Sequence, residues 1–270
     1  MTKFNPKIIP EGINSTPENP LVDFLKLIAQ LIPMVLIVYF LLDWGTRWAF
    51  SFISLKQEVQ MGTYILKKNE LKDGNKNAPM HSLVDALWLP FKNQDSPAPH
   101  GLVIEEAYAN AFMAPGGILQ VTTTLVNQSK SENELSFVVC HELGHYFHRH
   151  ALTRLSRSLV LGLISALLGL GSDNGALNLG IELGELTYSR EQESEADRFA
   201  LSCLNSKYGH IQEFDTFFKK AAQAEGLTNL KVLQYVSTHP IPENRIDELI
   251  ALGRNNNFKF HGDLKQHNLK

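Results

Sequence analysis

The hydrophobic and polar positions divide the chain into an apolar stretch near the N-terminus, a middle part with short β-prone runs, and a largely helical second half. The apolar stretch covers residues 27–42 and contains no charged side chain. Trp44 and Trp48 follow it, and such aromatic residues favour the membrane interface. Because about 20 helical residues cross a bilayer core of ~30 Å, the pattern predicts a transmembrane anchor over residues 27–48, preceded by a mobile tail over residues 1–26.

A buried core helix and a signal peptide are the alternatives to this anchor. The signal peptide fits less well, because the lead-in is long and residues 43–47 offer no small-x-small cleavage site. A second apolar stretch, residues 158–170, is broken by Gly162 and is short for a membrane span. It favours a buried helix, with an interfacial or re-entrant segment as its alternative.

Three β-prone runs precede the helical half, at residues 102–104, 108–113 and 118–125. The sequence Pro-Gly-Gly at residues 115–117 separates the second run from the third, which predicts a hairpin. After residue 130 the pattern is nearly all helical. We therefore predict an α+β fold that is predominantly helical, with a small β-sheet and the N-terminal transmembrane helix.

Composition narrows the classes of function. The 270 residues are 44% hydrophobic and 20% charged, so the chain can bury a core. The formal net charge of −3 provides no basic signal, and we expect no nucleic-acid partner. There are ten histidines but only two cysteines, Cys140 and Cys203, which are too few for a disulfide framework or a thiolate zinc site. The ligands of any metal should be imidazoles and carboxylates.

The central motif is His141-Glu142-x-x-His145, in a helix whose start is predicted by a capping signature at residues 131–134. Residues four apart lie one above the other on a helix face, so the two imidazoles can hold one zinc ion. Glu142 lies about 100° round the helix, where it can act as a base toward a water on the metal. Gly144 weakens the helix and predicts a close approach by backbone or substrate.

A catalytic zinc site needs a third protein ligand and an open position. His148 lies on the face of the first two histidines but a turn further on, and His150 lies off that face. We expect both side chains to be solvated or ion-paired rather than metal ligands.

A second capping signature, at residues 189–192, predicts another helix with several carboxylates. Glu193 and Asp197 are four apart on one face, so one could ligate zinc while the other accepts the Nδ1–H of a ligating histidine. A solvated acidic face is the alternative. Spacing alone leaves Glu191, Glu193 and Glu195 open as the third ligand.

At these motifs the chain resembles the zinc metallopeptidases that include the CAAX prenyl proteases and the HtpX-type membrane quality-control proteases, with the HExxH and ExxxD motifs of gluzincins. The matching segments are residues 110–117, 141–145, 189–197 and 238–246. The resemblance implies a zincin-like peptidase domain over residues 51–253, with residues 254–270 as a C-terminal tail. Because one clear span is present, it favours the smaller, single-anchor type over the multi-span prenyl proteases.

The resemblance also implies roles for individual residues. One Zn²⁺ would be held by His141, His145 and Glu193, with Glu142 as general base and Asp197 as partner of a ligating histidine. His239 would lie near the developing oxyanion, and Arg245 would hold that region together. Asn110, Ala111 and Phe112 would form an edge strand to which a peptide substrate adds. These roles predict a membrane-anchored zinc metalloendopeptidase of protein quality control.

Two other classes of function remain as alternatives. A non-enzymatic, membrane-tethered binding or chaperone-like protein would use the same groove, but it would tolerate loss of a ligand or of the base, and the sequence retains them all. A structural zinc site would be closed by four protein ligands. A span near the N-terminus, without a cleavable signal, favours a catalytic domain outside the cytoplasm, although the basic residues flanking the span are too few to orient it.

Overall fold

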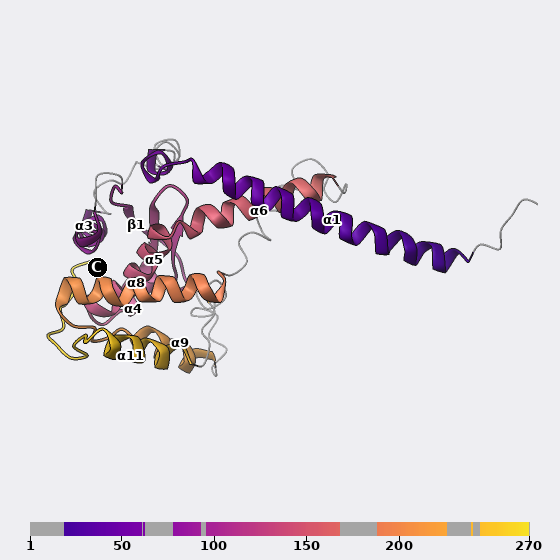
Figure 1. The fold of residues 1–270 in the computed structure, drawn as a ribbon. Helices are drawn as coiled ribbons and strands as arrows, with labels where there is room; N and C mark the ends of the chain where they lie inside the picture. Colours follow the sequence, from indigo (N-terminus) through magenta and orange to yellow (C-terminus); the bar gives the residue numbers. More distant parts are fainter. Residues whose placement is uncertain are drawn as a thin grey trace, which may run out of the picture.

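The computed structural model describes residues 19–60, 62, 78–92, 96–167, 188–225, 239 and 244–269. The elements labelled as in Figure 1 are α1 (Pro20–Ser51), α3 (Ala78–Trp88), the 3-10 helix η2 (Leu89–Phe91), β1 (His100–Ile104), β2 (Ala111–Ala114), β3 (Ile118–Thr122), α4 (Thr123–Gln128), α5 (Glu132–Phe147), α6 (His150–Leu167), α8 (Arg190–Tyr208), α9 (Thr216–Glu225) and α11 (Arg245–Asn255). The predicted α+β class, mostly helical with one small sheet, is confirmed.

The two helices that carry the motifs begin where their caps predict. The Ser131 side chain accepts a hydrogen bond from the backbone N–H of Glu134, which starts α5. Ser189 and Gln192 form a reciprocal capping box at the start of α8. These side chains satisfy backbone N–H groups that the first turn of a helix leaves without partners.

The sheet has the strand order β1-β3-β2, with β1 parallel and β2 antiparallel to β3. The predicted hairpin is therefore formed by β2 and β3. The strand predicted to reach residue 125 ends earlier, at Thr122, because the hydroxyl of Thr122 caps α4. Within the described residues, β2 lies at an edge of the sheet.

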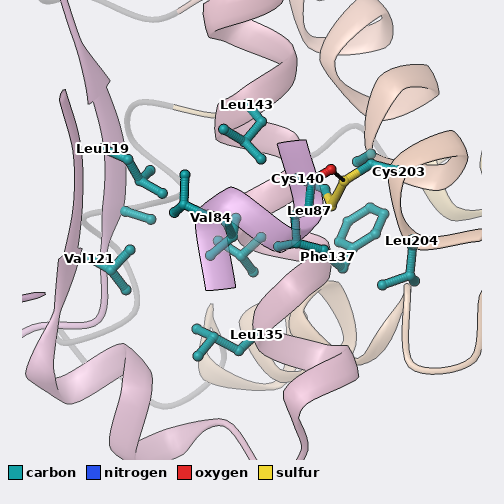
Figure 2. Packing of buried hydrophobic residues seen from close by; sticks show 14 of the residues in the cluster. Val84, Leu87, Leu119, Val121, Leu135, Phe137, Cys140, Leu143, Cys203 and Leu204 are labelled. Atoms are coloured by element: carbon teal, nitrogen blue, oxygen red, sulfur yellow. Dashed lines mark hydrogen bonds between the residues drawn. A yellow bond between two sulfur atoms is a disulfide. The ribbon is translucent and has the colours of Figure 1, made fainter. Parts of the chain in front are cut away.

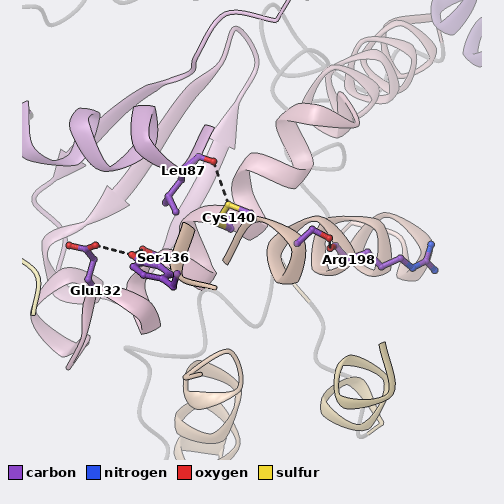
Figure 3. Close-up of a disulfide and its surroundings, with 8 residues drawn as sticks. Leu87, Glu132, Ser136, Cys140 and Arg198 are labelled. Carbon is purple, nitrogen blue, oxygen red and sulfur yellow. Dashed lines mark hydrogen bonds between the residues drawn. A yellow bond between two sulfur atoms is a disulfide. The ribbon is translucent and has the colours of Figure 1, made fainter. Parts of the chain in front are cut away.

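Helix α5 lies in the middle of the hydrophobic core (Figure 2). Leu119 of β3 and Val84 of α3 lie on one side of it, and Leu204 of α8 lies on another. Cys140 of α5 and Cys203 of α8 form a disulfide inside this core (Figure 3). The two cysteines, too few for a framework, thus make a single link between the two motif helices.

Helices α1 and α6 lie side by side and extend away from the body (Figure 1). The hydroxyls of Thr46 and Ser156 join them at 2.8 Å. The second half of α6 was predicted to be buried, but Leu159, Leu163 and Leu167 are exposed. Their four-residue spacing forms one apolar face along α6.

Near both termini, the segments differ from those that the sequence predicts. Helix α1 begins at Pro20, inside the segment predicted as a tail, and ends at Ser51. Residues 55–60 are helical again. The predicted C-terminal tail packs on the body: the carbonyl of Lys265 accepts a hydrogen bond from the N–H of Glu132 at 2.7 Å.

Candidate metal centre

Helices α5 and α8 bring two histidines and one glutamate together in the protein interior. His141, His145, Glu193 and His239 each offer a ligand atom, and these atoms lie within 4.8 Å of one another. The Nε2 atoms of His141 and His145 are 3.1 Å apart, and the Glu193 carboxylate oxygens lie 3.4–3.5 Å from them. Two imidazoles and a carboxylate converging in this way fit a zinc ion.

A glycine lets the two helices approach. A Cβ atom at Gly144 would lie 2.8 Å from the Cα and 2.9 Å from the carbonyl oxygen of Ala196 in α8. No side chain fits at these distances without moving one backbone. Gly144 was predicted to mark a close approach by backbone or substrate, and the partner is the backbone of α8.

The Nδ1 atom of His141 lies 2.9 Å from Asp197 Oδ1. Arg245 binds both oxygens of Asp197, at 2.7 and 2.8 Å, and also lies 3.1 Å from Glu193. Burial alone would raise the pKa of Asp197, but Arg245 and His141 outweigh it and lower that pKa. Both carboxylates therefore stay negative, as a metal ligand and its hydrogen-bonded support require.

Burial also lowers the pKa of His141 in the metal-free site, but the neighbouring Glu193 and Asp197 raise it to about 9. For Glu193, burial is outweighed by the adjacent His239 and His141, which hold its pKa well below the ordinary value. The electrostatics of the pocket thus favour a positive charge at the point where the ligand atoms meet.

Glu142 is fully buried, and burial raises the pKa of its carboxyl group. The Nε2 atom of His239 lies 3.4 Å from Glu142 Oε1, and its Nδ1 atom lies 3.0 Å from Glu193 Oε1. His239 therefore sits between the expected base and the expected third ligand. A raised pKa brings the proton affinity of this carboxyl group closer to that needed near neutral pH, which suits a group that both takes up and returns a proton.

Asn110, Ala111 and Phe112 lie at the start of the edge strand β2. The backbone N–H of Asn110 donates to Thr122 of the neighbouring strand at 2.9 Å, and its side-chain oxygen accepts from the N–H of Ala111. Phe112 pairs with Gln120. These contacts hold the three residues beside β3, while the substrate role stays a prediction.

The three glutamates that spacing left open have separate environments. Glu193 is buried beside the histidines, whereas Glu191 is exposed. Glu195 is half-buried and lies 3.0 Å from His150 Nε2. The three glutamates point to different faces of α8. The helix that packs against α8 therefore decides which of them reaches the histidines.

Two residues beside His145 were not expected there. Tyr188 stacks on the imidazole of His145, with ring centroids 3.7 Å apart, and the Nδ1 atom of His150 lies 2.8 Å from His145 Nδ1. His150 contacts a carboxylate, but it is buried, and burial lowers its pKa to about 4, so its neutral imidazole hydrogen-bonds to Glu195 instead of forming the predicted ion pair. Tyr188 directly precedes the helix cap Ser189, a position where an apolar residue often packs back on the helix. This position is the sequence feature that could have indicated its place beside His145.

A helix that carries two histidines and a glutamate, facing a glutamate of a second helix, is the arrangement of the HExxH metallopeptidases. The family model described as Peptidase family M48 matches residues 75–252. The chain belongs to peptidase family M48, and its resemblance to the HtpX-type quality-control proteases is confirmed.

Curated relatives are similar over much of the chain. The chain is 26% identical over 223 residues to a beta-barrel assembly-enhancing protease of Escherichia coli (strain K12), covering 76% of this chain and 45% of the relative. It is 28% identical over 196 residues to mitochondrial metalloendopeptidase OMA1 of Arabidopsis thaliana, covering 70% of this chain and 36% of the relative. The chain thus spans less than half the length of these relatives.

Proposed function

We propose that this protein is a membrane-anchored zinc metalloendopeptidase that acts in protein quality control. The observation that carries the proposal is the convergence of His141, His145 and Glu193 in a buried pocket next to the carboxyl group of Glu142. Tetrahedral sites with nitrogen and oxygen ligands are typical of catalytic zinc. The names of the relatives, an assembly-enhancing protease and a metalloendopeptidase, support this proposal.

Zinc, when bound by these three residues, would supply the Lewis acidity that polarises the scissile carbonyl group and lowers the pKa of water. Glu142 takes the proton of the attacking water and passes it to the leaving amine. His239, 3.4 Å from Glu142, donates a hydrogen bond to the developing oxyanion. Asp197 and Arg245 keep His141 oriented throughout the cycle.

The substrate would bind as an added strand beside β2. An edge strand presents backbone N–H and C=O groups that a peptide can pair with, whatever its side chains. Asn110, Ala111 and Phe112 form this edge, and β2 packs on α5, the helix that carries the base. Binding through the backbone suits a protease that must accept many unfolded chains.

The anchor would be α1, the one helix within the described residues that is long and apolar enough to span a membrane. The catalytic domain would lie outside the cytoplasm. The disulfide between Cys140 and Cys203 supports this side, because disulfides persist in oxidising compartments. Protease protection of the C-terminal domain in intact cells and in spheroplasts tests the orientation: protection in spheroplasts would contradict it.

The experiment that tests the activity compares the wild type with Glu142→Gln in detergent, measuring casein cleavage and zinc content. We expect the variant to keep one zinc ion and to lose activity by several orders of magnitude, because the base is gone while the ligands stay. Glu191→Gln, on the exposed face of α8, is the matched control and should keep full activity.

A chelator should abolish cleavage by the wild type, and added zinc should restore it. An active Glu142→Gln protein would exclude the mechanism. A zinc-loaded wild type that binds unfolded peptides without cleaving them would instead support the binding or chaperone-like alternative.

A further inference from the structure

His150 reaches the metal centre through a special turn. Helix α5 ends at Phe147, and Arg149 then adopts a positive φ of 57°, a conformation that is uncommon for residues other than glycine. Arg149 is held there by Glu58, whose carboxylate its Nε atom contacts at 3.1 Å. The turn brings His150, the first residue of α6, back against His145. Such backbone conformations persist where the surrounding structure demands them.

Contacts of His150 form a continuous chain of polar atoms that ends at the metal centre. Its Nδ1 atom lies 2.8 Å from Nδ1 of His145, and its Nε2 atom lies 3.0 Å from Oε2 of Glu195. His150 is only 4% exposed, so water cannot readily replace either partner. Both ring nitrogens of this histidine are therefore committed to protein groups.

The direction of these hydrogen bonds follows from where the protons must be. If the Nε2 atom of His145 gives its lone pair to a metal, the neutral ring keeps its proton on Nδ1. That proton points to His150 Nδ1, which must accept it. The proton of a neutral His150 then lies on Nε2 and is donated to Glu195, an acceptor when ionised.

We propose that His150 and Glu195 are positioning residues that hold the proton of His145 on Nδ1 and so present its Nε2 lone pair to the zinc ion. This inference rests on the proposed zinc site, but not on catalysis. Asp197 has the equivalent place at His141, where it lies 2.9 Å from Nδ1. Each zinc-binding histidine would thus have its own carboxylate support, direct for His141 and through a second imidazole for His145.

The alternative is that these residues bind a second metal ion, because ligand atoms of His148, His150 and Glu195 also lie within 4.8 Å of one another. A metal on Nε2 of His150 would leave the proton of that ring on Nδ1, which would have to point at His145. The proton of His145 would then lie on Nε2, where it blocks the first site. The two arrangements exclude each other, and the hydrogen-bonded arrangement predicts one zinc ion per chain.

The test measures zinc affinity of the full chain in detergent by competition with a chromogenic chelator. His150→Leu removes the acceptor, and we expect it to weaken zinc binding about 10- to 100-fold, the usual loss when such a supporting contact is removed. His150→Gln can accept the same proton with its amide oxygen and should recover much of the affinity. This rescue separates hydrogen bonding from mere filling of space.

A control and a spectrum complete the test. His148→Ala should leave both the affinity and the stoichiometry of one zinc unchanged, since exposed His148 stacks on His150 with ring centroids 5.5 Å apart, while the hydrogen bonds of His150 go to His145 and Glu195. In the cobalt-substituted protein, His150→Leu should alter the visible absorption bands while His148→Ala should not. Unchanged affinity in His150→Leu, or a second zinc ion that His148→Ala removes, would overturn the proposal. Because cleavage is not measured, an inactive wild type with intact zinc binding would contradict the proposed function alone.

Discussion

Two pairs of helices, α5 with α8 and α1 with α6, differ in what surrounds their apolar residues. Every residue of α5 from Asn133 to Tyr146 is buried, and its histidines and Glu142 lie against polar partners from α8 and from His239. In α1, by contrast, only Asp43 is buried, and it pairs with Arg47. Leucines of α6 are exposed beside it.

The difference shows that apolar character alone does not decide where a helix resides. A polar group in a helix interior must find partners, because an unpaired buried charge costs several kcal/mol. The polar groups of α5 can find them only in another part of the same chain. The central part of α1 has no such groups, so lipid can surround it. The following predictions separate the two pairs, in order of decreasing effect.

Arg245→Ala should be the most damaging of these changes. It leaves the buried carboxylates of Asp197 and Glu193 without their cation, and breaking a buried ion pair costs about 3–5 kcal/mol. Urea unfolding of the metal-free protein would show this loss. Arg254→Ala, on the exposed side of the same helix, is the control and should change the free energy of unfolding by less than about 0.5 kcal/mol. Equal effects would mean that the pocket does not depend on its ion pairs.

The disulfide should also contribute strongly to the α5–α8 pair. Cys140 and Cys203 are 63 residues apart, and closing a loop of this length lowers the entropy of the unfolded chain by an amount worth about 4 kcal/mol. The Cys140→Ala/Cys203→Ala protein should unfold at correspondingly lower urea concentration. A reductant should destabilise the wild type but not this variant. Urea unfolding of the wild type that is the same with and without the reductant would contradict the disulfide.

Two glycine substitutions compare the helix pairs directly. Gly144→Ala pushes a methyl group into the backbone of α8 and should cost about 1–3 kcal/mol, with weaker zinc binding. Gly45→Ala, in α1, meets no atom within 4 Å and should be neutral or slightly stabilising, since alanine is the better helix former. Thermal unfolding and zinc titration check both, and a tolerated Gly144→Ala would show that the helices can separate without loss.

The smallest effect on stability is expected on the outer face of α6. A spin label at Leu163→Cys should leave the free energy of unfolding within about 0.5 kcal/mol of the wild type, because Leu163 is exposed. In lipid nanodiscs the label should nevertheless collide more with oxygen than with a water-soluble nickel reagent. A label at Leu264→Cys, on the body, should show the reverse. Similar accessibility at the two positions would mean that α6 does not touch the bilayer.

Local signals predicted the parts of the fold that depend on neighbours in the sequence. The starts of α5 and α8 follow from Ser131 and Ser189, whose side chains cap the next turn. The β2–β3 hairpin follows from its turn residues. The end of β3 was wrong by three residues because β-branched Thr122 reads as strand but serves as a helix cap.

Long-range signals were weaker for a physical reason. Spacing shows which residues share a helix face, but not which helix packs against that face. The pattern therefore leaves Glu191, Glu193 and Glu195 equivalent, and it was the family resemblance that favoured Glu193. His150 was passed over because a histidine five residues after His145 lies off its face in a continuous helix, and the turn at Arg149 ends that continuity.

By itself the sequence determined the helix that carries His141, Glu142 and His145, the apolar span before it and the family, because these depend on residues close together in the chain. Tertiary structure decided what surrounds each of them. It brought Glu193 and His239 to the histidines, linked the two cysteines, placed His150 behind His145 and left the leucines of α6 exposed. Burial and pairing are properties of the packed molecule, since the partner of each polar group lies far away in the sequence.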